Sequence, residues 1–416
     1  MPLVSSLLLL IIAARVLGRL MMRFQQPAIV GEMLAGVLLG PSVFAVVHAS
    51  EALSGISELA VFLVVLSAGL EMKFADVVEA FKGKGIIIGL LGFVIPLAAG
   101  MLTGWMFGLD VNRSVFLGLC IAITALPVAV GILQSFNLLN SDIAKYSIAT
   151  AVLNDVLALM IMGVILGLPE QRSFDAVAIS VLVILWKLLV LGAVIVSLNW
   201  LLEKVYDWGF HVERIPERLV QWLGNDALFG IVVVFVLAFG TVSEQLGFHF
   251  VIGAFFGALL IDRKFFLAER YHVLDSTLRS VSDGFLAPIF FVYLGLEFNA
   301  TEIPSIWFAV IVLVVSMVTK VVAGWVGSRM IKLPPVKALG IGIILNGRGV
   351  MELVIASIAY ERGLIDQGLF STLVLMGVIT TLITPILFRK YVLPKLDKSD
   401  FSSPPETPPQ PIVQNA

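Results

Sequence analysis

The sequence predicts an all-α polytopic membrane protein with about thirteen transmembrane helices. Hydrophobic residues make up 59% of the 416-residue chain and charged residues only 13%, whereas soluble domains are about half apolar and a quarter charged. Apolar runs long enough to cross a bilayer follow one another from Leu3 to about residue 393. A soluble globular fold is thereby excluded, and the net charge of −2 offers no basic face for nucleic acid.

The first apolar run has the length of a signal peptide but lacks its flanks. No basic residue precedes Leu3 and no small-residue cleavage site follows Met22, so we expect a retained helix. Gly and Pro interrupt several of the later runs. The predicted spans cover residues 3–22, 27–47, 54–71, 84–107, 114–135, 142–167, 175–202, 227–244, 249–262, 280–297, 304–331, 336–361 and 368–393.

The basic residues test this assignment of spans. With a cytoplasmic C-terminus, an odd number of spans places the N-terminus outside. Of the 27 Lys and Arg, 21 then fall in cytoplasmic segments or at the cytoplasmic ends of spans, three fall in outside loops (Arg113, Arg172 and Arg362), and three fall well inside spans. Cytoplasmic loops of membrane proteins carry such an excess of positive charge. We therefore expect one membrane domain, residues 1–393, and a disordered cytoplasmic tail, residues 394–416, rich in Pro, Ser and Gln.

Three spans carry a charge near their centre. Asp155 lies in the sixth span, Lys320 in the eleventh and Arg348 in the twelfth. An ionisable group at the bilayer centre costs at least about 2.5–3.5 kcal/mol on insertion scales. Three such groups at one depth predict a single polar site at the midplane. A fourth, Lys187 in the seventh span, is expected to be structural.

A faint internal repeat links the two halves of the chain. Residues 65–71 and 291–297 both end in Gly-Leu-Glu, and residues 31–38 and 253–260 share spaced small residues. Both pairs lie seven spans apart, and an odd offset reverses the direction of crossing. The sequence thus predicts two six-helix units of inverted topology joined by the seventh span, an arrangement typical of secondary transporters.

The fifth and twelfth spans, which correspond in this repeat, are both predicted to be broken. Pro127 removes a helical donor and frees backbone carbonyls near Thr124. The segment 345–349, Leu-Asn-Gly-Arg-Gly, favours unwinding in the other span. Arg348 and Glu352 stand one turn apart and can offset the helix dipoles that end at the midplane.

An ordered series of motifs along residues 3–393 is similar to that of one protein family. The series comprises Gly31–Pro41, Ala68–Glu71, Thr124–Pro127, Asn154-Asp155, Gly253–Phe255, Pro288–Phe291, Lys320 and Gly347–Leu353. In these motifs the chain resembles the membrane domain of the monovalent cation:proton antiporter family, in the branch with bacterial sodium/proton exchangers and glutathione-gated potassium efflux systems.

The resemblance implies a fold, a location and roles for individual residues. It implies a scaffold-and-dimer domain, a mobile core with two crossed broken helices, homodimers in a bacterial inner membrane, and alternating access by an elevator-like movement. Asp155 falls on the ion-binding aspartate, Asn154 on its variable neighbour and Lys320 on the basic residue facing them. No cofactor and no nucleotide-binding domain after residue 393 are expected.

Two features of this sequence leave the stoichiometry open. Electrogenic members resemble one another in having two adjacent aspartates, whereas this chain has Asn154 in the first position, as electroneutral members do. Those more often carry arginine where this chain has Lys320. One proton is exchanged per cation if Lys320 keeps its charge, and two if it also releases a proton. We expect the first.

The residues also indicate how exchange can work. A carboxylate can hold either a proton or a cation, and hard cations such as Na⁺ prefer oxygen ligands. Asp155, the Asn154 amide, the Thr124 hydroxyl and freed carbonyls supply such oxygens, so the lipid-embedded protein is expected to bind a monovalent cation transiently at Asp155. Na⁺ is the first candidate, and K⁺ and Li⁺ are alternatives.

The sequence also allows other functions to be considered. A potassium/proton efflux antiporter is the alternative within the same class. A passive cation channel predicts ion flux that ignores a pH gradient, and a sodium-coupled organic-anion symporter is disfavoured by the midplane Lys and Asp. An intramembrane enzyme is not expected, because the sequence has no HExxH motif and no second aspartate near a span centre.

Overall fold

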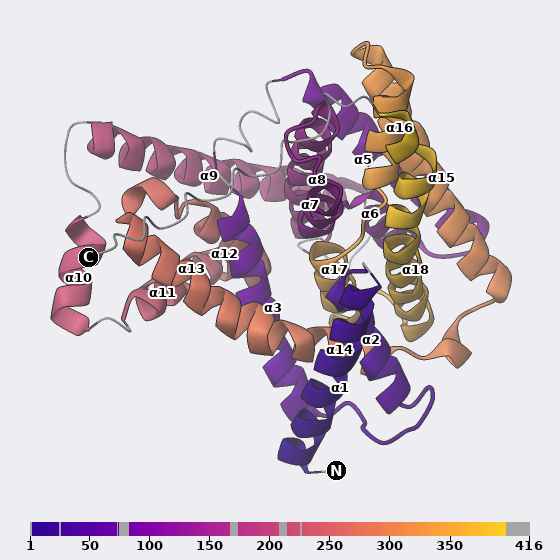
Figure 1. The fold of residues 1–416 in the computed structure, drawn as a ribbon, viewed down its shortest axis with the longest axis horizontal. Helices are drawn as coiled ribbons and strands as arrows, with labels where there is room; N and C mark the ends of the chain where they lie inside the picture. The colour runs from indigo at the N-terminus through magenta and orange to yellow at the C-terminus, as the bar shows by residue number, and fades with distance from the viewer. Residues whose placement is uncertain are drawn as a thin grey trace, which may run out of the picture.

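The computed structural model describes residues 2–24, 26–72, 74, 83–166, 174–207, 214–224 and 227–396, and over these residues its regular structure is entirely helical (Figure 1). Most of the predicted tail, residues 397–416, and the loop residues Lys73 and Lys82 lie outside this part. The helices are α1 (Leu3–Arg23), α2 (Ala28–Leu39), α3 (Glu51–Glu71), α5 (Gly85–Met106), α6 (Val111–Ala122), α7 (Leu126–Ser135), α8 (Asp142–Leu166), α9 (Phe174–Asp207), α10 (Arg214–Leu223), α11 (Ala227–Gln245), α12 (Phe250–Leu259), α13 (Ala268–Val281), α14 (Ala287–Glu297), α15 (Ile306–Met330), α16 (Pro335–Ile344), α17 (Val350–Glu361) and α18 (Gln367–Tyr391).

The predicted apolar runs all contain helix. Nine helical stretches of the described chain are long and apolar enough to cross a membrane, with α6–α7 and α13–α14 each taken as one stretch. A π-helical turn, Ser282–Leu286, joins α13 to α14. The helices α2, α12 and α16 are apolar but shorter. The all-α membrane fold is therefore confirmed, while the number thirteen stays a prediction.

Side-chain caps begin several of the helices. Ser50, Asp110, Ser305 and Asp366 each accept a hydrogen bond from the backbone N–H three residues later, which satisfies a donor that the first turn leaves free. An ion pair of 2.8 Å between Arg113 and Asp366 ties the beginning of α6 to that of α18.

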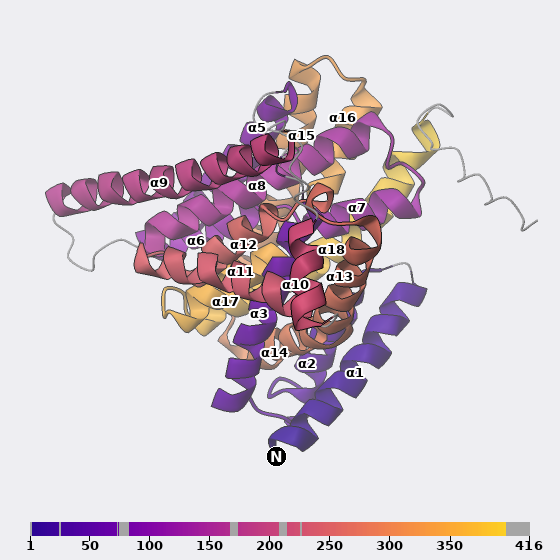
Figure 2. The ribbon, with the colours of Figure 1, turned by 90° about the vertical axis from the view of Figure 1, so that its left-hand side faces the viewer.

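The helices pack as two groups. One group, called the core here, consists of α5–α8 and α15–α18, and the other, called the scaffold, consists of α1–α3 and α11–α14. Most contacts lie within each group, and few helix pairs join them. Figure 1 shows the core helices mainly on the right and α11–α13 on the left. In Figure 2 the long helix α9 runs as an inclined rod along the edge of the molecule.

Close glycine contacts recur in the two halves of the chain, as the predicted repeat requires. In the scaffold, α2 packs on α14 through Gly36 and Gly295, and α3 packs on α12 through Gly69 and Ala258. In the core, Gly100 meets the backbone of Gly118, and Gly324 meets that of Gly342. The two core pairs are 224 residues apart. The core contact of the first half therefore recurs in the second, and the scaffold contacts join the two halves, as small residues permit between membrane helices.

The outlying charge on α9 has a structural partner. The Nζ atom of Lys187 donates a hydrogen bond of 2.8 Å to the carbonyl of Leu246, at the end of α11. This contact agrees with the structural role predicted for Lys187 and gives it no link to the core.

We expect Gly36→Val to destabilise the scaffold. A Cβ atom at Gly36 would lie 2.0 Å from the carbonyl oxygen of Val292, so α2 and α14 must separate, and overpacking of this kind costs about 1–3 kcal/mol. Thermal unfolding in detergent measures the effect. Gly230→Val on α11 is the control, because a Cβ atom there meets nothing within 4 Å. Equal melting temperatures for the two variants would refute this contact.

Candidate functional site

The two broken spans meet at their breaks. Helix α6 ends at Ala122 and α7 begins at Leu126, while α16 ends at Ile344 and α17 begins at Val350. The backbone N–H of Ala125 donates to the carbonyl of Gly347 at 2.9 Å, and the Thr124 hydroxyl donates to the carbonyl of Leu345 at 3.0 Å. Four half-helix ends are thus held together by residues more than 200 positions apart.

Local sequence explains why each span breaks at this point. Pro127 occupies the first turn of α7. A backbone N–H at this position would have no acceptor within the helix, so the proline breaks no helical hydrogen bond there. In the other span, a Cβ atom on Gly349 would lie 2.8 Å from the Cβ of Ala125, and one on Gly347 would lie 3.1 Å from Val128. The two glycines therefore allow the breaks to touch.

Arg348 closes the C-terminal end of α6. Its guanidinium donates to the carbonyl oxygens of Cys120 and Ile123, both at 2.6 Å, and of Ile121 at 2.7 Å. The side chain is buried. A helix that ends inside a membrane leaves its last carbonyls without partners and carries partial negative charge there. The planar, forked guanidinium of arginine donates to several carbonyls and offsets the negative charge of the helix end at the same time.

Lys320, from α15, adds a second positive charge to the same helix end. Its Nζ donates to the carbonyl of Ala122, to the carbonyl of Gly92 at 3.0 Å and to the Thr124 hydroxyl at 2.8 Å. The side chain is completely buried. All three acceptors are uncharged, so the ammonium is held by oxygen atoms of the break and of α5.

Polar side chains also serve the second break. Glu352 lies in the first turn of α17, 3.6 Å from the Nε of Arg348, which is the pair that the sequence predicts. A carboxylate there favours the positive end of the helix dipole. The amide nitrogen of Asn346 donates to the carbonyl of Gly342 at 3.1 Å and so caps α16, a role that the sequence reasoning missed.

The side-chain amide of Asn154 fits beside Lys320 in two orientations, because its oxygen and nitrogen ends have nearly the same shape. In one, its nitrogen lies 3.3 Å from the carbonyl of Ala122 and from the Thr124 hydroxyl, and its oxygen faces only carbonyls. In the other, its oxygen accepts from Lys320 Nζ at 3.2 Å, and its nitrogen donates to the carbonyls of Thr150 and Gly89. The second satisfies both ends of the amide and is preferred for that reason.

Asp155 lies near the middle of α8 and is only 3% exposed. Its Oδ1 atom has no hydrogen-bond partner, and no basic nitrogen of the described chain lies within 4 Å of its carboxylate. The sequence predicts Lys320 as its partner, but the structure directs Lys320 to the α6 end and to Asn154. A buried carboxylate without a partner is strongly disfavoured unless it holds a proton or a cation.

Cavities lie on opposite faces of the molecule. One of about 570 Å³ is lined by Glu71, Asp262 and Asp275 and reaches Pro127 on α7. A smaller one, of about 310 Å³, lies between Glu58, Glu244 and Glu361. The first cavity lies at helix ends that the sequence predicts to be cytoplasmic, and the second cavity lies at helix ends that it predicts to be outside. The relative sidedness of these ends thus agrees with the predicted topology.

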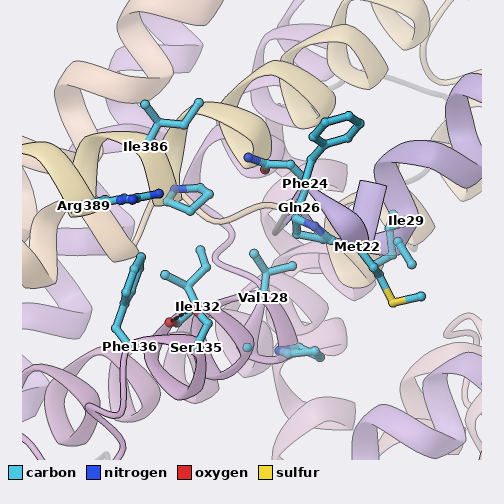
Figure 3. Close-up of a pocket in the computed structure, with 15 residues that line it drawn as sticks. Met22, Phe24, Gln26, Ile29, Val128, Ile132, Ser135, Phe136, Ile386 and Arg389 are labelled. Carbon is cyan, nitrogen blue, oxygen red and sulfur yellow. Dashed lines mark hydrogen bonds between the residues drawn. The ribbon is translucent and has the colours of Figure 1, made fainter. Parts of the chain in front are cut away.

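A third cavity, of about 760 Å³, flanks the other side of α7 (Figure 3). It shares Pro127 and Gly131 with the first cavity, so α7 is open on two sides near its break. Its lining is mainly apolar. No sequence pattern predicts it, because its walls come from helices far apart in the chain.

Comparisons with known proteins agree with this architecture. Residues 5–392 match the family described as the sodium/hydrogen exchanger, transmembrane. The chain is 27% identical to a Na⁺/H⁺ antiporter of Enterococcus hirae, covering 94% of this chain and 98% of that one, and 24% identical to the Na⁺/H⁺-K⁺ antiporter GerN of Bacillus cereus, covering 94% and 96%. The solved structure of the sodium proton antiporter MjNhaP1 from Methanocaldococcus jannaschii matches with a TM-score of 0.71 at 16% identity, covering 94% and 98%, which establishes the fold.

Removing the Arg348 charge is expected to destabilise the core. Arg348→Met loses the three carbonyl contacts and leaves Glu352 unpaired, and breaking a buried pair in this way costs about 3–5 kcal/mol. Arg348→Lys should be intermediate, because an ammonium cannot reproduce the fork. Melting temperatures in detergent measure both effects. Arg362→Met, at the exposed end of the same helix, should melt like the unmodified protein, and similar melting of Arg348→Met would count against the cap.

Proposed function

The chain belongs to the sodium/hydrogen exchanger family, and we propose that it exchanges Na⁺ for H⁺ across the membrane in which it is embedded, with Asp155 as the residue that carries either ion. One observation carries this proposal. Asp155 is a buried carboxylate near the middle of a spanning helix, and its Oδ1 has no partner. Such a group is neutralised by a proton or by a cation, but not by both at once, and this competition is the basis of antiport.

The cation ligands come from Asp155 and the neighbouring break. The Thr124 hydroxyl donates its proton to Leu345 and accepts from Lys320, so one lone pair of its oxygen is left for a cation. The amide oxygen of Asn154 is likewise shared with Lys320. Na⁺ is a hard cation that binds such oxygens, and water can complete its shell.

Lys320 keeps its charge throughout the cycle. Its three N–H groups have four acceptors within hydrogen-bond distance, namely Gly92, Ala122, Thr124 and Asn154. A proton leaving this nitrogen would also leave the α6 carbonyl end with less positive charge. Only Asp155 then changes its protonation, which favours one proton per cation and electroneutral exchange.

Access to Asp155 alternates between the two faces. The cavity with Glu71, Asp262 and Asp275 on one side and the cavity with Glu58, Glu244 and Glu361 on the other each hold more carboxylates than arginines, which favours the entry of cations. Asp155 lines neither of them. The sparse packing between core and scaffold supports an elevator-like movement in which the core carries the site from one cavity to the other.

Surface residues support an orientation of the chain in the membrane and its assembly into a dimer. Basic residues such as Arg23, Lys145 and Arg389 support a cytoplasmic C-terminus and an outside N-terminus, and the bacterial relatives support a bacterial inner membrane. Exposed tryptophans on α9, Trp186 and Trp200, support a homodimer through this helix. Light scattering in detergent should then give twice the mass of one chain, and a monomeric mass would refute the dimer.

Potassium is the second candidate cation. The relative GerN is named as a Na⁺/H⁺-K⁺ antiporter, and the oxygen ligands proposed here do not exclude the larger ion. An ion panel of Na⁺, Li⁺ and K⁺ therefore belongs in the functional assay.

Asp155→Asn is expected to abolish exchange. In proteoliposomes that contain a pH-sensitive dye, addition of Na⁺ should move protons for the unmodified protein, and the variant should give no signal with any cation of the panel. The matched control is Asp142→Asn on the same helix, whose carboxylate pairs with Lys337 at an exposed end and should be dispensable for exchange. Both variants should keep their melting temperature.

Two outcomes of this assay would overturn the proposal. Exchange retained by Asp155→Asn would show that another group carries the ions. Cation uptake that ignores an imposed pH gradient would indicate a passive channel.

A further inference from the structure

The apolar cavity beside α7 lies between the two helix groups. Its scaffold wall is the end of α1 and the beginning of α2, and its core wall is α7 with the last turns of α18. Figure 3 shows Arg389 and Ile386 of α18 across the cavity from Val128 and Ile132 of α7. The apolar side chains that line it include Met22, Phe24, Ile29, Val128, Ile132, Phe136 and Ile386.

Two polar side chains stand out in this lining. Arg389 is its charged member, is exposed, and has no carboxylate within 4 Å among the described residues. The amide oxygen of Gln26 is buried without a hydrogen-bond partner. The cavity therefore presents one cation, Arg389, at the edge of an apolar groove, while the Gln26 oxygen is shielded within its wall.

This lining does not suit a route for cations. The neighbouring cavity on the other side of α7 is lined by three carboxylates, Glu71, Asp262 and Asp275, and by two guanidinium groups, Arg263 and Arg279. The described lining of the apolar cavity carries Arg389 and no carboxylate. Arg389 would repel Na⁺. Cations are thus directed to the acidic side of α7, and the apolar side is left for a different occupant.

The occupant must combine an apolar body with a negative head. The helix ends at this cavity carry Arg23 on α1 and Arg389 and Lys390 on α18, which places its mouth at the level of lipid headgroups on the basic face. Basic pockets between membrane helices bind anionic headgroups, and about 760 Å³ lies in the usual range for ligand pockets.

We propose that this cavity binds one anionic glycerophospholipid from the surrounding leaflet. Its phosphate pairs with Arg389, and one acyl chain lies between α7 and the α1–α2 wall. Because these walls belong to the core and the scaffold, the lipid holds the two groups in the arrangement described here. A ligand that binds one conformation better than another shifts the population toward it, so the anionic lipid slows exchange.

Native mass spectrometry of the full chain tests the binding itself. Purified protein is incubated with phosphatidylglycerol or with phosphatidylcholine. The unmodified protein should retain one phosphatidylglycerol, and Arg389→Gln should retain about tenfold less, the loss expected from one charged hydrogen bond. Lys390→Gln removes an adjacent charge that does not line the cavity and should retain as much as the unmodified protein. Equal retention by Arg389→Gln, or equal retention of both lipids by the unmodified protein, would overturn the site.

A second variant separates this groove from general attraction of lipid to basic residues. Ile386→Trp places a larger side chain in the groove and leaves Arg389 in place, and it should also reduce phosphatidylglycerol retention. Unchanged retention in Ile386→Trp would mean that no acyl chain enters the cavity. Both tests measure binding and do not require exchange activity, so they can fail independently of the proposed Na⁺/H⁺ exchange.

The effect on exchange is measured in vesicles of phosphatidylcholine with and without phosphatidylglycerol. The anionic lipid should slow the unmodified protein and Lys390→Gln, while Arg389→Gln should be insensitive to it. Equal slowing of all three would assign the effect to the membrane surface and overturn the regulatory part of the proposal.

Discussion

The arrangement at the midplane follows from one constraint: a helix that ends inside a membrane must have partners for its last carbonyls, because lipid offers none. Helix α6 ends at Ala122, and four successive carbonyls from Cys120 to Ile123 accept hydrogen bonds from Arg348 or Lys320. Arginine and lysine are costly in a membrane, yet here their charge opposes the negative end of the helix dipole. Glu352 in turn stands beside Arg348. The two broken spans therefore stabilise each other through the contacts of these charges.

These contacts distinguish Lys320 and Arg348, which hold the broken helices, from Asp155, the proposed carrier of the ions. Lys320 is held by uncharged oxygens and Arg348 by carbonyls, whereas the Asp155 carboxylate has no basic group within 4 Å in the part of the chain that the structure describes. Neutralising Asp155 with a proton or a cation therefore disturbs no ion pair. Asn154 contributes an oxygen without a titrating group. If Asp155 is the only group of the site that changes its charge, as proposed above, one-for-one exchange is the simplest cycle.

Much of this fold was predictable because membrane spans obey simple rules. The apolar runs, the breaks at Pro127 and at Gly347 to Gly349, and the position of Asp155 follow from local composition and from the cost of burying charge. The partners of Arg348 and Lys320 were not predictable, since they are backbone carbonyls that look alike in any sequence and lie about 200 residues away. The same holds for the cap by Asn346 and for the cavities. One signal was present but missed: Gly100 and Gly118 recur as Gly324 and Gly342 at a constant offset, which would have extended the repeat into the core.

The number of protons released when Na⁺ binds tests the central claim most directly. Isothermal calorimetry of the purified protein, repeated in buffers with different ionisation enthalpies, counts these protons without any membrane. At a pH where the site is protonated before Na⁺ is added, a single carboxylate that holds either ion predicts about one proton released per bound Na⁺, and none in Asp155→Asn, which should not bind the cation. Binding of Na⁺ without proton release, or release of two protons, would contradict a site with Asp155 as its only variable charge.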